Sequence, residues 1–482
     1  MMYIKLTINL IFVHHPTGGE FVEMSNTLQF LGAVRQVTGS KHLLECDGLR
    51  ILVDCGLDMD GQDETNGTHC FGFDPKTIDV LLLTHAHIDH TGLVPVLVKE
   101  GFEGLIYCTY ATYHLTKLLL FDAARLNLKK SKRRRSQQDF YGPREVEDCL
   151  DYFQPIDFEQ KTGLSDHTSF YFRTAGHLLG AAHIVLTTND QTIVFSGDLG
   201  RPKYPLLKDP EPIPPADFII CESTYGMRVH RDKNPGRTLQ KIIHESCVVI
   251  PGRLIIPSFS VGRTQTLLYL LNRLHTEGHL PSIKIFTDSP LARKSTRVYQ
   301  DFVEYLDTEA QSFHKSQGSL FNFDNLVYLD DMNSAEEIDN YNEPCIIITS
   351  SGMAKGGKSE EHIYRNLENS YCTILFIGYC SEGTLGRRLI DGMQTFRRFD
   401  EEYKVNARVI STDVLSGHGD YNDLIDFFKR QDKDRLQKVF LVHGELEAME
   451  NLQQSLLHTG LEEVAIPSLG QVFELKAREK FV

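Results

Sequence analysis

This 482-residue sequence lacks the features of membrane-spanning, secreted and low-complexity proteins. No apolar run approaches the length of a membrane span, and no segment is of low complexity. The first fifteen residues hold a short apolar run broken by Thr7 and Asn9, and they lack the small-residue cleavage site of a signal peptide. We therefore expect ordinary folded domains with no membrane partner.

The sequence also lacks the cysteine spacings of metal-binding or disulfide-bonded motifs. The ten cysteines are scattered, and no two of them form a C-x-x-C motif. This spacing excludes a cysteine-based zinc finger and a disulfide framework. Reduced thiols are typical of the cytoplasm, where we expect this protein to act. Because patterned strands begin just after Met24, we interpret residues 1–24 as an extension that need not belong to the native start.

Positive charge is scarce. The net charge is -15, and long-range repulsion argues against a protein that coats nucleic acid or acidic membrane with its whole surface. A local basic cleft remains compatible with this balance. The clearest basic run, Lys129 to Arg135, has six positive side chains in seven positions. A solvated loop and a nucleic-acid-facing patch are equally good interpretations of it.

Strand-like runs dominate the sequence before about residue 228. The runs 41–46 and 49–54 are joined by Asp47 and Gly48, which predicts a hairpin. From residue 228 strand-like and helix-like runs alternate, as in a parallel sheet with helices on both faces. From about residue 405 histidines follow the strands again. We infer that one domain, 228–404, is inserted into another, whose two parts are 25–227 and 405–482.

A phosphate-loop pattern lies within the inserted part. Residues 351–359 read S-G-M-A-K-G-G-K-S, and from Gly352 they match the G-x-x-x-x-G-K-[ST] motif of nucleotide hydrolases. The match follows a strand-like run and precedes a helix-like run, as the motif requires. A nucleotide hydrolase also needs an apolar run that ends in an acidic partner for Mg²⁺, and we find no convincing one. We therefore interpret the loop as a phosphate contact at a helix N-terminus, not as an ATPase site.

The densest signal is T-H-A-H-I-D-H-T-G, residues 84–92, at the end of a strand-like run. Three imidazoles and a carboxylate within six residues are costly to bury without a compensating partner, so the cluster predicts a metal site. In a tight loop, His85 and His87 can point one way while Asp89 and His90 point another. The spacing therefore suits two metal ions side by side.

Further candidate ligands follow other strand-like runs. His177, Asp198 and His443 each come just after such a run. Each alone is a weak signal, because a histidine or aspartate at a strand end is more often structural. Together with the dense cluster, they predict convergence on one rim of a sheet, where active sites commonly form.

The motifs occur in a fixed order along the chain: V-D-C-G with Asp54, H-A-H-I-D-H, the segments of His177 and Asp198, C-E-S-T-Y-G with Glu222, S-G-H-G-D with His418, and V-H-G-E with His443. In this combination the chain resembles, from Leu28 to the C-terminus, the β-CASP nucleases of the metallo-β-lactamase superfamily, which process RNA. The resemblance implies an α/β fold, namely a metallo-β-lactamase αββα sandwich with an inserted, doubly wound parallel-sheet β-CASP domain.

The resemblance also implies two Zn²⁺ ions per chain. The ligands of the first ion would be His85, His87, His177 and Asp198. The ligands of the second would be Asp89, His90, His443 and the shared Asp198. Asp54 would orient ligands without binding metal itself. Zinc is argued from ligand type alone, and manganese or iron could fill the same mixed sites.

The activity that the resemblance implies is hydrolysis of single-stranded RNA by a hydroxide that two metals activate, with Asp89 and Asp198 among the catalytic residues. His418 would act as the general acid, positioned and kept protonated by Glu222. RNA-cleaving members carry a histidine at the position of His443, where DNA-repair members tend to have an apolar residue. The resemblance therefore favours RNA as the substrate.

RNA phosphate contacts are expected in the inserted domain. In the phosphate-like loop the candidates are Ser351, Lys355 and Lys358. Arg263, Arg387 and the neighbouring Arg388 stand at the starts of two other predicted helices. Each of them can contact a phosphate or simply be a solvated charge, and the two interpretations are equally good. Met227 departs from the family pattern, in which a polar residue stands before the arginine, here Arg228. The sequence therefore does not show what the loop after E-S-T-Y-G contacts.

Two other functions remain open from the sequence. A small-molecule hydrolase of the same superfamily would share the metal site, but the large inserted domain and the E-S-T-Y-G and S-G-H-G-D segments count against it. A catalytically inactive RNA-binding scaffold is disfavoured because every ligand position is filled. Endonucleolytic and 5′-to-3′ exonucleolytic cleavage fit equally well, and the sequence is compatible with a homodimer.

Overall fold

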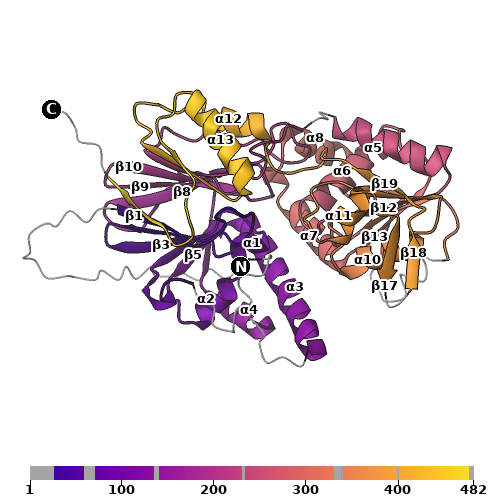
Figure 1. Cartoon of the computed structure of the whole chain (residues 1–482), viewed down its shortest axis with the longest axis horizontal. Helices are drawn as coiled ribbons and strands as arrows, with labels where there is room; N and C mark the ends of the chain where they lie inside the picture. Colours follow the sequence, from indigo (N-terminus) through magenta and orange to yellow (C-terminus); the bar gives the residue numbers. More distant parts are fainter. Residues whose placement is uncertain are drawn as a thin grey trace, which may run out of the picture.

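The computed structural model describes residues 26–58, 71–134, 141–230, 234–329, 338, 340–398 and 401–476, with only the backbone given for 129–134. Two seven-stranded sheets and one six-stranded sheet form the framework of the chain (Figure 1). Among the described residues, no helix combines the length and the apolar character that crossing a bilayer requires.

The first sheet has the strand order β22-β1-β2-β3-β4-β5-β6. Strands β22 and β1 to β3 pair antiparallel, whereas β3 to β6 run parallel. The strands are β1 (Asn26–Phe30), β2 (His42–Cys46), β3 (Leu49–Val53), β4 (Val80–Leu82), β5 (Leu105–Thr109), β6 (Phe153–Ile156) and β22 (Val472–Leu475).

The second sheet has the order β21-β20-β11-β10-β9-β8-β7. Strands β7 to β10 pair antiparallel, whereas β10, β11, β20 and β21 run parallel. The strands are β7 (Thr162–Gly163), β8 (Thr168–Thr174), β9 (Ala182–Thr188), β10 (Gln191–Phe195), β11 (Phe218–Glu222), β20 (Lys438–Val442) and β21 (Val464–Ala465).

The two sheets stack face to face, and helices cover their outer faces, so that the unit has four layers (Figure 1). Alternate apolar residues of both sheets, such as Phe30, Phe195 and Phe440, fill the space between them. The first sheet is covered by α1 (Ile88–Thr91), α2 (Val94–Lys99), α3 (Tyr110–Arg134) and α4 (Pro143–Leu150). The second is covered by α12 (Tyr421–Phe427) and α13 (Leu446–His458).

The predicted hairpin between β2 and β3 is confirmed. Cys46 faces Leu49 across the turn. Asp47 has φ 50° and Gly48 has φ 75°, which are the left-handed conformations that a two-residue turn of this kind requires.

The inserted unit holds an all-parallel sheet with the order β14-β13-β15-β12-β16-β19. Its strands are β12 (Arg253–Pro257), β13 (Lys284–Asp288), β14 (Leu326–Tyr328), β15 (Cys345–Thr349), β16 (Cys372–Phe376) and β19 (Arg408–Ser411). One face packs against α5 (Pro235–His244), α6 (Arg263–Thr276), α7 (Pro290–Asp301) and α8 (Thr308–Gln317), and the other against α10 (Gly357–Asn366) and α11 (Leu385–Ile390). A small hairpin of β17 (Thr395–Arg398) and β18 (Glu401–Lys404) adjoins this unit.

The expected four-layer sandwich with an inserted doubly wound parallel sheet is confirmed. One expected boundary differs from the structure. We assigned the strand-like run near residue 408 to the C-terminal part that begins at 405, but β19 pairs with β16 at the edge of the inserted sheet. The inserted sheet therefore extends past residue 404. The sequence could not show this boundary, because the place of β19 depends on its pairing with β16, a strand distant in the sequence.

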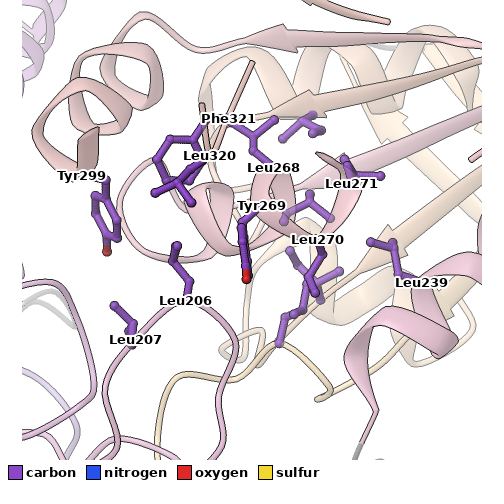
Figure 2. Packing of buried hydrophobic residues seen from close by; sticks show 14 of the residues in the cluster. Leu206, Leu207, Leu239, Leu268, Tyr269, Leu270, Leu271, Tyr299, Leu320 and Phe321 are labelled. Carbon is purple, nitrogen blue, oxygen red and sulfur yellow. The ribbon is translucent and has the colours of Figure 1, made fainter. Parts of the chain in front are cut away.

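A single apolar cluster joins the inserted unit to the sandwich. Leu206 and Leu207 of the sandwich lie beside Tyr269 and Tyr299 of the inserted helices (Figure 2). The N–H of Leu179 donates to the hydroxyl of Tyr299 at 3.4 Å. Burying a large apolar side chain contributes about 1.5–3 kcal/mol, so this shared core fixes how the two units sit against each other.

We predict that Gly56→Ala destabilises the protein. A Cβ at Gly56 would lie 1.7 Å from the carbonyl oxygen of Asp89, so the loop that carries Asp89 must shift, and forced overpacking of this kind costs about 1–3 kcal/mol or more. The melting temperature, followed by circular dichroism, should fall by several degrees. Gly163→Ala is the control, because its nearest contact would be 4.0 Å away. Equal melting temperatures for both variants would contradict this prediction.

Candidate metal centre

The cluster of residues 84–92 comprises the turn after β4 and the short helix α1. Asp54, at the end of β3, anchors this turn, because its carboxylate accepts the N–H of Thr84 at 2.8 Å and contacts Nδ1 of His90 at 2.7 Å. The hydroxyl of Thr84 also donates to both oxygens of Asp54, at 3.1 and 2.9 Å. Asp54 therefore contacts both the ring of His90 and the backbone of the turn, and its role in orienting metal ligands stays a prediction.

The first predicted ligand set comes together in the structure. It combines Nε2 of His85, Nδ1 of His87, Nε2 of His177 and one oxygen of Asp198, and these four atoms lie within 4.8 Å of one another. Oδ2 of Asp198 is 3.4 Å from His85 and 3.5 Å from His177. The four residues come from the turn after β4, the β8–β9 connection and the end of β10.

The second predicted set lies on the other side of Asp198. Asp89, His90 and His443 each offer one ligand atom, and these atoms also lie within 4.8 Å of one another. The other oxygen of Asp198, Oδ1, is 3.3 Å from Nε2 of His90 and 3.6 Å from Nδ1 of His443. The two oxygens of Asp198 therefore face the two sets separately.

The protein alone satisfies these polar atoms poorly. Nε2 of His90, Oδ1 of Asp198 and Nε2 of His443 are buried and make no hydrogen bond. Their contacts are at ion-pair distance, 3.3 Å between His90 and Asp198 and 3.5 Å between His443 and Asp89, and buried polar groups without hydrogen bonds cost free energy. Ring nitrogens also approach each other, with Nε2 of His85 3.0 Å from Nδ1 of His87. A cavity of about 20 Å³ lies beside His90, Asp198 and His443. Imidazole and carboxylate donors in this arrangement suit divalent cations.

The first set is neutral in its histidines. Burial lowers the pKa of His87 to about 4, and it lowers the pKa values of His85 and His177 well below the ordinary range. Burial would raise the pKa of Asp198, but the nearby imidazoles of His443 and His90 outweigh it and lower that pKa strongly. Neutral imidazoles beside a carboxylate offer lone pairs to a cation.

In the second set, neighbouring carboxylates favour the protonated form of two imidazoles. Burial lowers the pKa of His90, but Asp198 and Asp54 outweigh it and raise that pKa well above the ordinary value. The pKa of His443 is also raised, because Asp198 and Asp89 outweigh its burial. The pKa of Asp89 falls to about 2, since contacts with His443 and His90 outweigh burial. A cation bound between these groups would replace the protons, because a ligating imidazole is neutral.

Backbone strain accompanies two of these residues. Asp54 has φ 58° and His443 has φ 50°, a left-handed conformation that costs a non-glycine residue about 1–3 kcal/mol. Both follow directly after a strand, β3 and β20 respectively. Such strain persists only where surrounding contacts hold it, as the N–H of His443 does by donating to Ala33 at 2.7 Å.

Two threonines at the site were missed by the sequence analysis. Thr84 hydrogen-bonds Asp54, as described above, and the hydroxyl of Thr224 lies 3.1 Å from Nδ1 of His443. Both stand inside quoted motifs, T-H-A-H-I-D-H and C-E-S-T-Y-G. Their adjacency to candidate ligands was the available signal, although it does not show where a hydroxyl points.

Glu222 and His418 meet beside the two sets. Nδ1 of His418 is 3.1 Å from Oε1 of Glu222 and 4.0 Å from Oδ2 of Asp198. Glu222 is buried, and its carboxylate also accepts the N–H of Leu199 at 2.6 Å and that of Thr224 at 3.2 Å. The side chain of His418 keeps 15% of its surface exposed, so one edge of its ring faces the solvent side of the site.

The phosphate-like loop has the expected local form, because α10 begins at Gly357. Its groups are already engaged, however. The N–H of Ser359 donates to the oxygen of Ser350 at 2.8 Å, and Lys358 forms an ion pair with the buried Asp288. The other oxygen of Asp288 contacts Nε2 of His362 at 2.9 Å.

One sequence interpretation of this loop was wrong. We found no convincing apolar run that ends in an acidic residue, yet β13 ends in Asp288 and runs parallel beside β15, the strand before the loop. Because Asp288 is occupied by Lys358 and His362, this arrangement still offers no free carboxylate for Mg²⁺.

The other predicted phosphate contacts are separate from the metal ligands. Lys355 is exposed, Arg263 stacks over Phe259 at 4.7 Å, and Nε of Arg387 is 2.9 Å from Asp391. Gly262, which precedes Arg263, lies close to the side chain of Leu178, the neighbour of His177. The start of α11 lies next to the phosphate-like loop, since the N–H of Gly386 donates to the backbone oxygen of Met353 at 3.1 Å.

Family models match three successive parts of the chain. Residues 42–246 match the metallo-beta-lactamase superfamily, residues 264–389 match the Beta-Casp domain, and residues 402–467 match the Zn-dependent metallo-hydrolase RNA specificity domain. The first and third matches lie mainly on the four-layer unit and the second lies within the inserted unit.

Relatives with curated names match over most of this chain. Ribonuclease TTHA0252 of Thermus thermophilus is 34% identical over 442 residues, which cover 91% of this chain and 98% of that protein. An RNase J-like protein of Methanocaldococcus jannaschii is 30% identical and covers 87% of this chain and 92% of its own length. Endoribonuclease YSH1 of Candida glabrata is 30% identical and matches 90% of this chain but 57% of its own length.

A solved structure, a protein of unknown function from Enterococcus faecalis, covers 93% of this chain and all of its own, with a TM-score of 0.54 and 11% identity. At that identity the likeness concerns the fold alone. The family, by contrast, follows from the sequence matches over nearly the full length of both Ribonuclease TTHA0252 and this chain. The chain therefore belongs to the β-CASP family of the metallo-β-lactamase superfamily.

Proposed function

We propose that this protein is a ribonuclease that hydrolyses phosphodiester bonds of single-stranded RNA with two Zn²⁺ ions. The observation that carries the proposal is Asp198, whose two oxygens face two separate sets of ligand atoms. The first ion would be held by His85, His87, His177 and Asp198. The second would be held by Asp89, His90, His443 and Asp198.

Two metal ions at these positions would activate a water molecule and attract a phosphate oxygen. The protein's own contribution is to hold the ligands rigidly, which the contacts of Asp54 with His90 and of Thr224 with His443 support. Every candidate ligand is present, so an inactive scaffold is disfavoured.

The leaving ribose oxygen needs a proton, and His418 is the candidate donor. With Nδ1–H directed to Oε1 of Glu222 at 3.1 Å, the imidazole keeps Nε2 free of that contact. A ring that carries a proton on Nε2 can give it to the leaving oxygen as the phosphorus–oxygen bond breaks. The buried Glu222 is therefore a positioning residue, and His418 is the catalytic acid.

The inserted unit would bind the RNA backbone through Ser351, Lys355, Arg263 and Arg387. Lys355 is the best placed of the lysines, because it is exposed at the phosphate-like loop. Lys358 shares its charge with Asp288, so we expect it to hold the loop in shape and to attract phosphate weakly. Arginines at helix starts suit phosphate through charge-assisted hydrogen bonds.

We predict that Asp198→Ala loses both metal ions, because this carboxylate serves both ligand sets. His87→Ala should lose about one ion per chain, since it contributes to the first set alone. Zinc measured by inductively coupled plasma mass spectrometry after gel filtration tests both expectations. Lys355→Ala serves as the control and should bind as much zinc as the unmodified protein. Full metal content in Asp198→Ala would contradict the shared-ligand assignment.

We predict cleavage of a 5′-labelled single-stranded RNA and its loss in a chelator. Gel analysis of product lengths separates internal cuts from stepwise release of nucleotides at the 5′ end. A parallel panel of thioesters, lactones and sulfate esters tests the small-molecule alternative. Hydrolysis of that panel without any cleavage of RNA would overturn the proposed substrate class.

We predict that His418→Ala lowers kcat for RNA about 10²- to 10⁴-fold, the usual contribution of a general acid, and that it keeps its metal content. Glu222→Gln should lower kcat less, because the amide oxygen can still accept the Nδ1 proton but carries no charge. Single-turnover cleavage together with zinc analysis measures both effects. Unchanged turnover in His418→Ala would remove this residue from the mechanism.

A further inference from the structure

The chain crosses between the sandwich and the inserted unit twice, and the two crossings lie side by side. The described part of the outgoing crossing is Ser223 to His230, after β11, and the returning crossing runs from Thr412 to Asp420, between β19 and α12. His418 stands on the returning crossing. The position of the proposed acid therefore depends on how these two segments are joined.

His230, on the outgoing crossing, joins them at several points. Its side chain is 3% exposed. Its Nε2 lies 3.0 Å from the backbone oxygen of His418, and its own N–H donates to Asp420 at 3.0 Å. Its Nδ1 is 3.5 Å from a carboxylate oxygen of Asp413, just beyond β19. His230 thus contacts three points of the segment that carries the acid, two through its imidazole and one through its backbone N–H.

Other contacts fix the returning crossing from the sandwich side. The side chains of Arg201 and Tyr204 donate to the backbone oxygens of Val414 and Leu415 at 3.1 Å, and the N–H of Gly419 donates to Leu199 at 2.8 Å. These bonds hold the neighbours of His418. The hydrogen bond from His230 is made to the carbonyl oxygen of His418 itself, the residue that carries the proposed acid.

We propose that His230 is a positioning residue for the general acid, which rests on the proposed role of His418. The imidazole donates its Nε2 proton to the carbonyl of His418 and so fixes the backbone from which that ring reaches Glu222. Tyr225 packs against both rings, with centroids 5.2 Å from His230 and 5.9 Å from His418. A positioning error of about 1 Å can lower a rate about 10²-fold, so a buried side chain that touches no substrate can still govern the proton transfer.

His230→Ala should lower kcat for RNA about 10- to 100-fold, with KM changed less than about threefold and with zinc content unchanged. His230→Gln should recover most of the loss, because its side-chain N–H can donate to the same carbonyl. Steady-state kinetics on a 5′-labelled RNA, with zinc analysis, measures these quantities. Equal losses in both variants, or a parallel loss of zinc, would overturn the proposal.

A second readout separates this role from a general loss of structure. Product analysis of the unmodified enzyme identifies the ribose oxygen that leaves, and an RNA with sulfur at that position leaves as a thiolate, which needs no proton. The defect of His230→Ala should shrink to less than about threefold on this RNA, because the acid is then dispensable. A defect of equal size on both RNAs would overturn the positioning role.

Two further variants complete the experiment. His183→Ala removes another buried imidazole that donates to a backbone oxygen, that of Ser196 at 2.6 Å, and it should lower the melting temperature with no selective defect on the oxygen substrate. His418→Ala tests the underlying proposal. If His418→Ala is fully active, the acid assignment fails. If His418→Ala is impaired while His230→Ala is fully active, only the role of His230 fails.

Discussion

The buried carboxylate of Asp198 is the constraint on which the site depends. It is 2% exposed and has three histidines within 3.5 Å, on two sides. A charge at such a depth is costly unless partners or metal ions compensate it. The protein supplies imidazoles on both sides, yet Oδ1 of Asp198 and Nε2 of His90 remain without hydrogen bonds. The fold therefore gathers buried imidazoles and carboxylates of the kind that can hold divalent cations.

The four-layer sandwich is what makes this convergence possible. The dense histidine cluster follows β4 of the first sheet, whereas Asp198, Glu222 and His443 lie at the ends of the parallel strands β10, β11 and β20 of the second. Parallel neighbours end at the same rim, so ligands far apart in the sequence meet there. The inserted unit departs after Glu222 and returns just before His418, and the proposed acid thus belongs to the junction between the two units.

The sequence predicted which distant residues lie together at the candidate site, because metal chemistry restricts residue types and strand patterns mark where strands end. The Asp47–Gly48 hairpin was predictable for a local reason, since its two residues adopt φ values that few others adopt easily. The pairing of β19 with β16, the contact of Lys358 with Asp288 and the bond from His230 to His418 were not predictable. Each depends on two segments that are distant in sequence, and the strand order of the inserted sheet, in which β13 neighbours β15, cannot be derived from apolar patterns.

The overall acidity of the chain is compatible with an anionic substrate because the decisive charges are local. Two Zn²⁺ ions carry four positive charges, whereas Asp89 and Asp198 contribute two negative ones and ligating imidazoles are neutral. The metal centre would remain positive within a chain of net charge -15. Repulsion from distant surface carboxylates is screened beyond about 8–10 Å at physiological ionic strength, whereas attraction at the metals acts over a few ångströms in a partly buried site. If the proposed centre holds these ions, the short-range attraction would therefore decide where a phosphodiester binds.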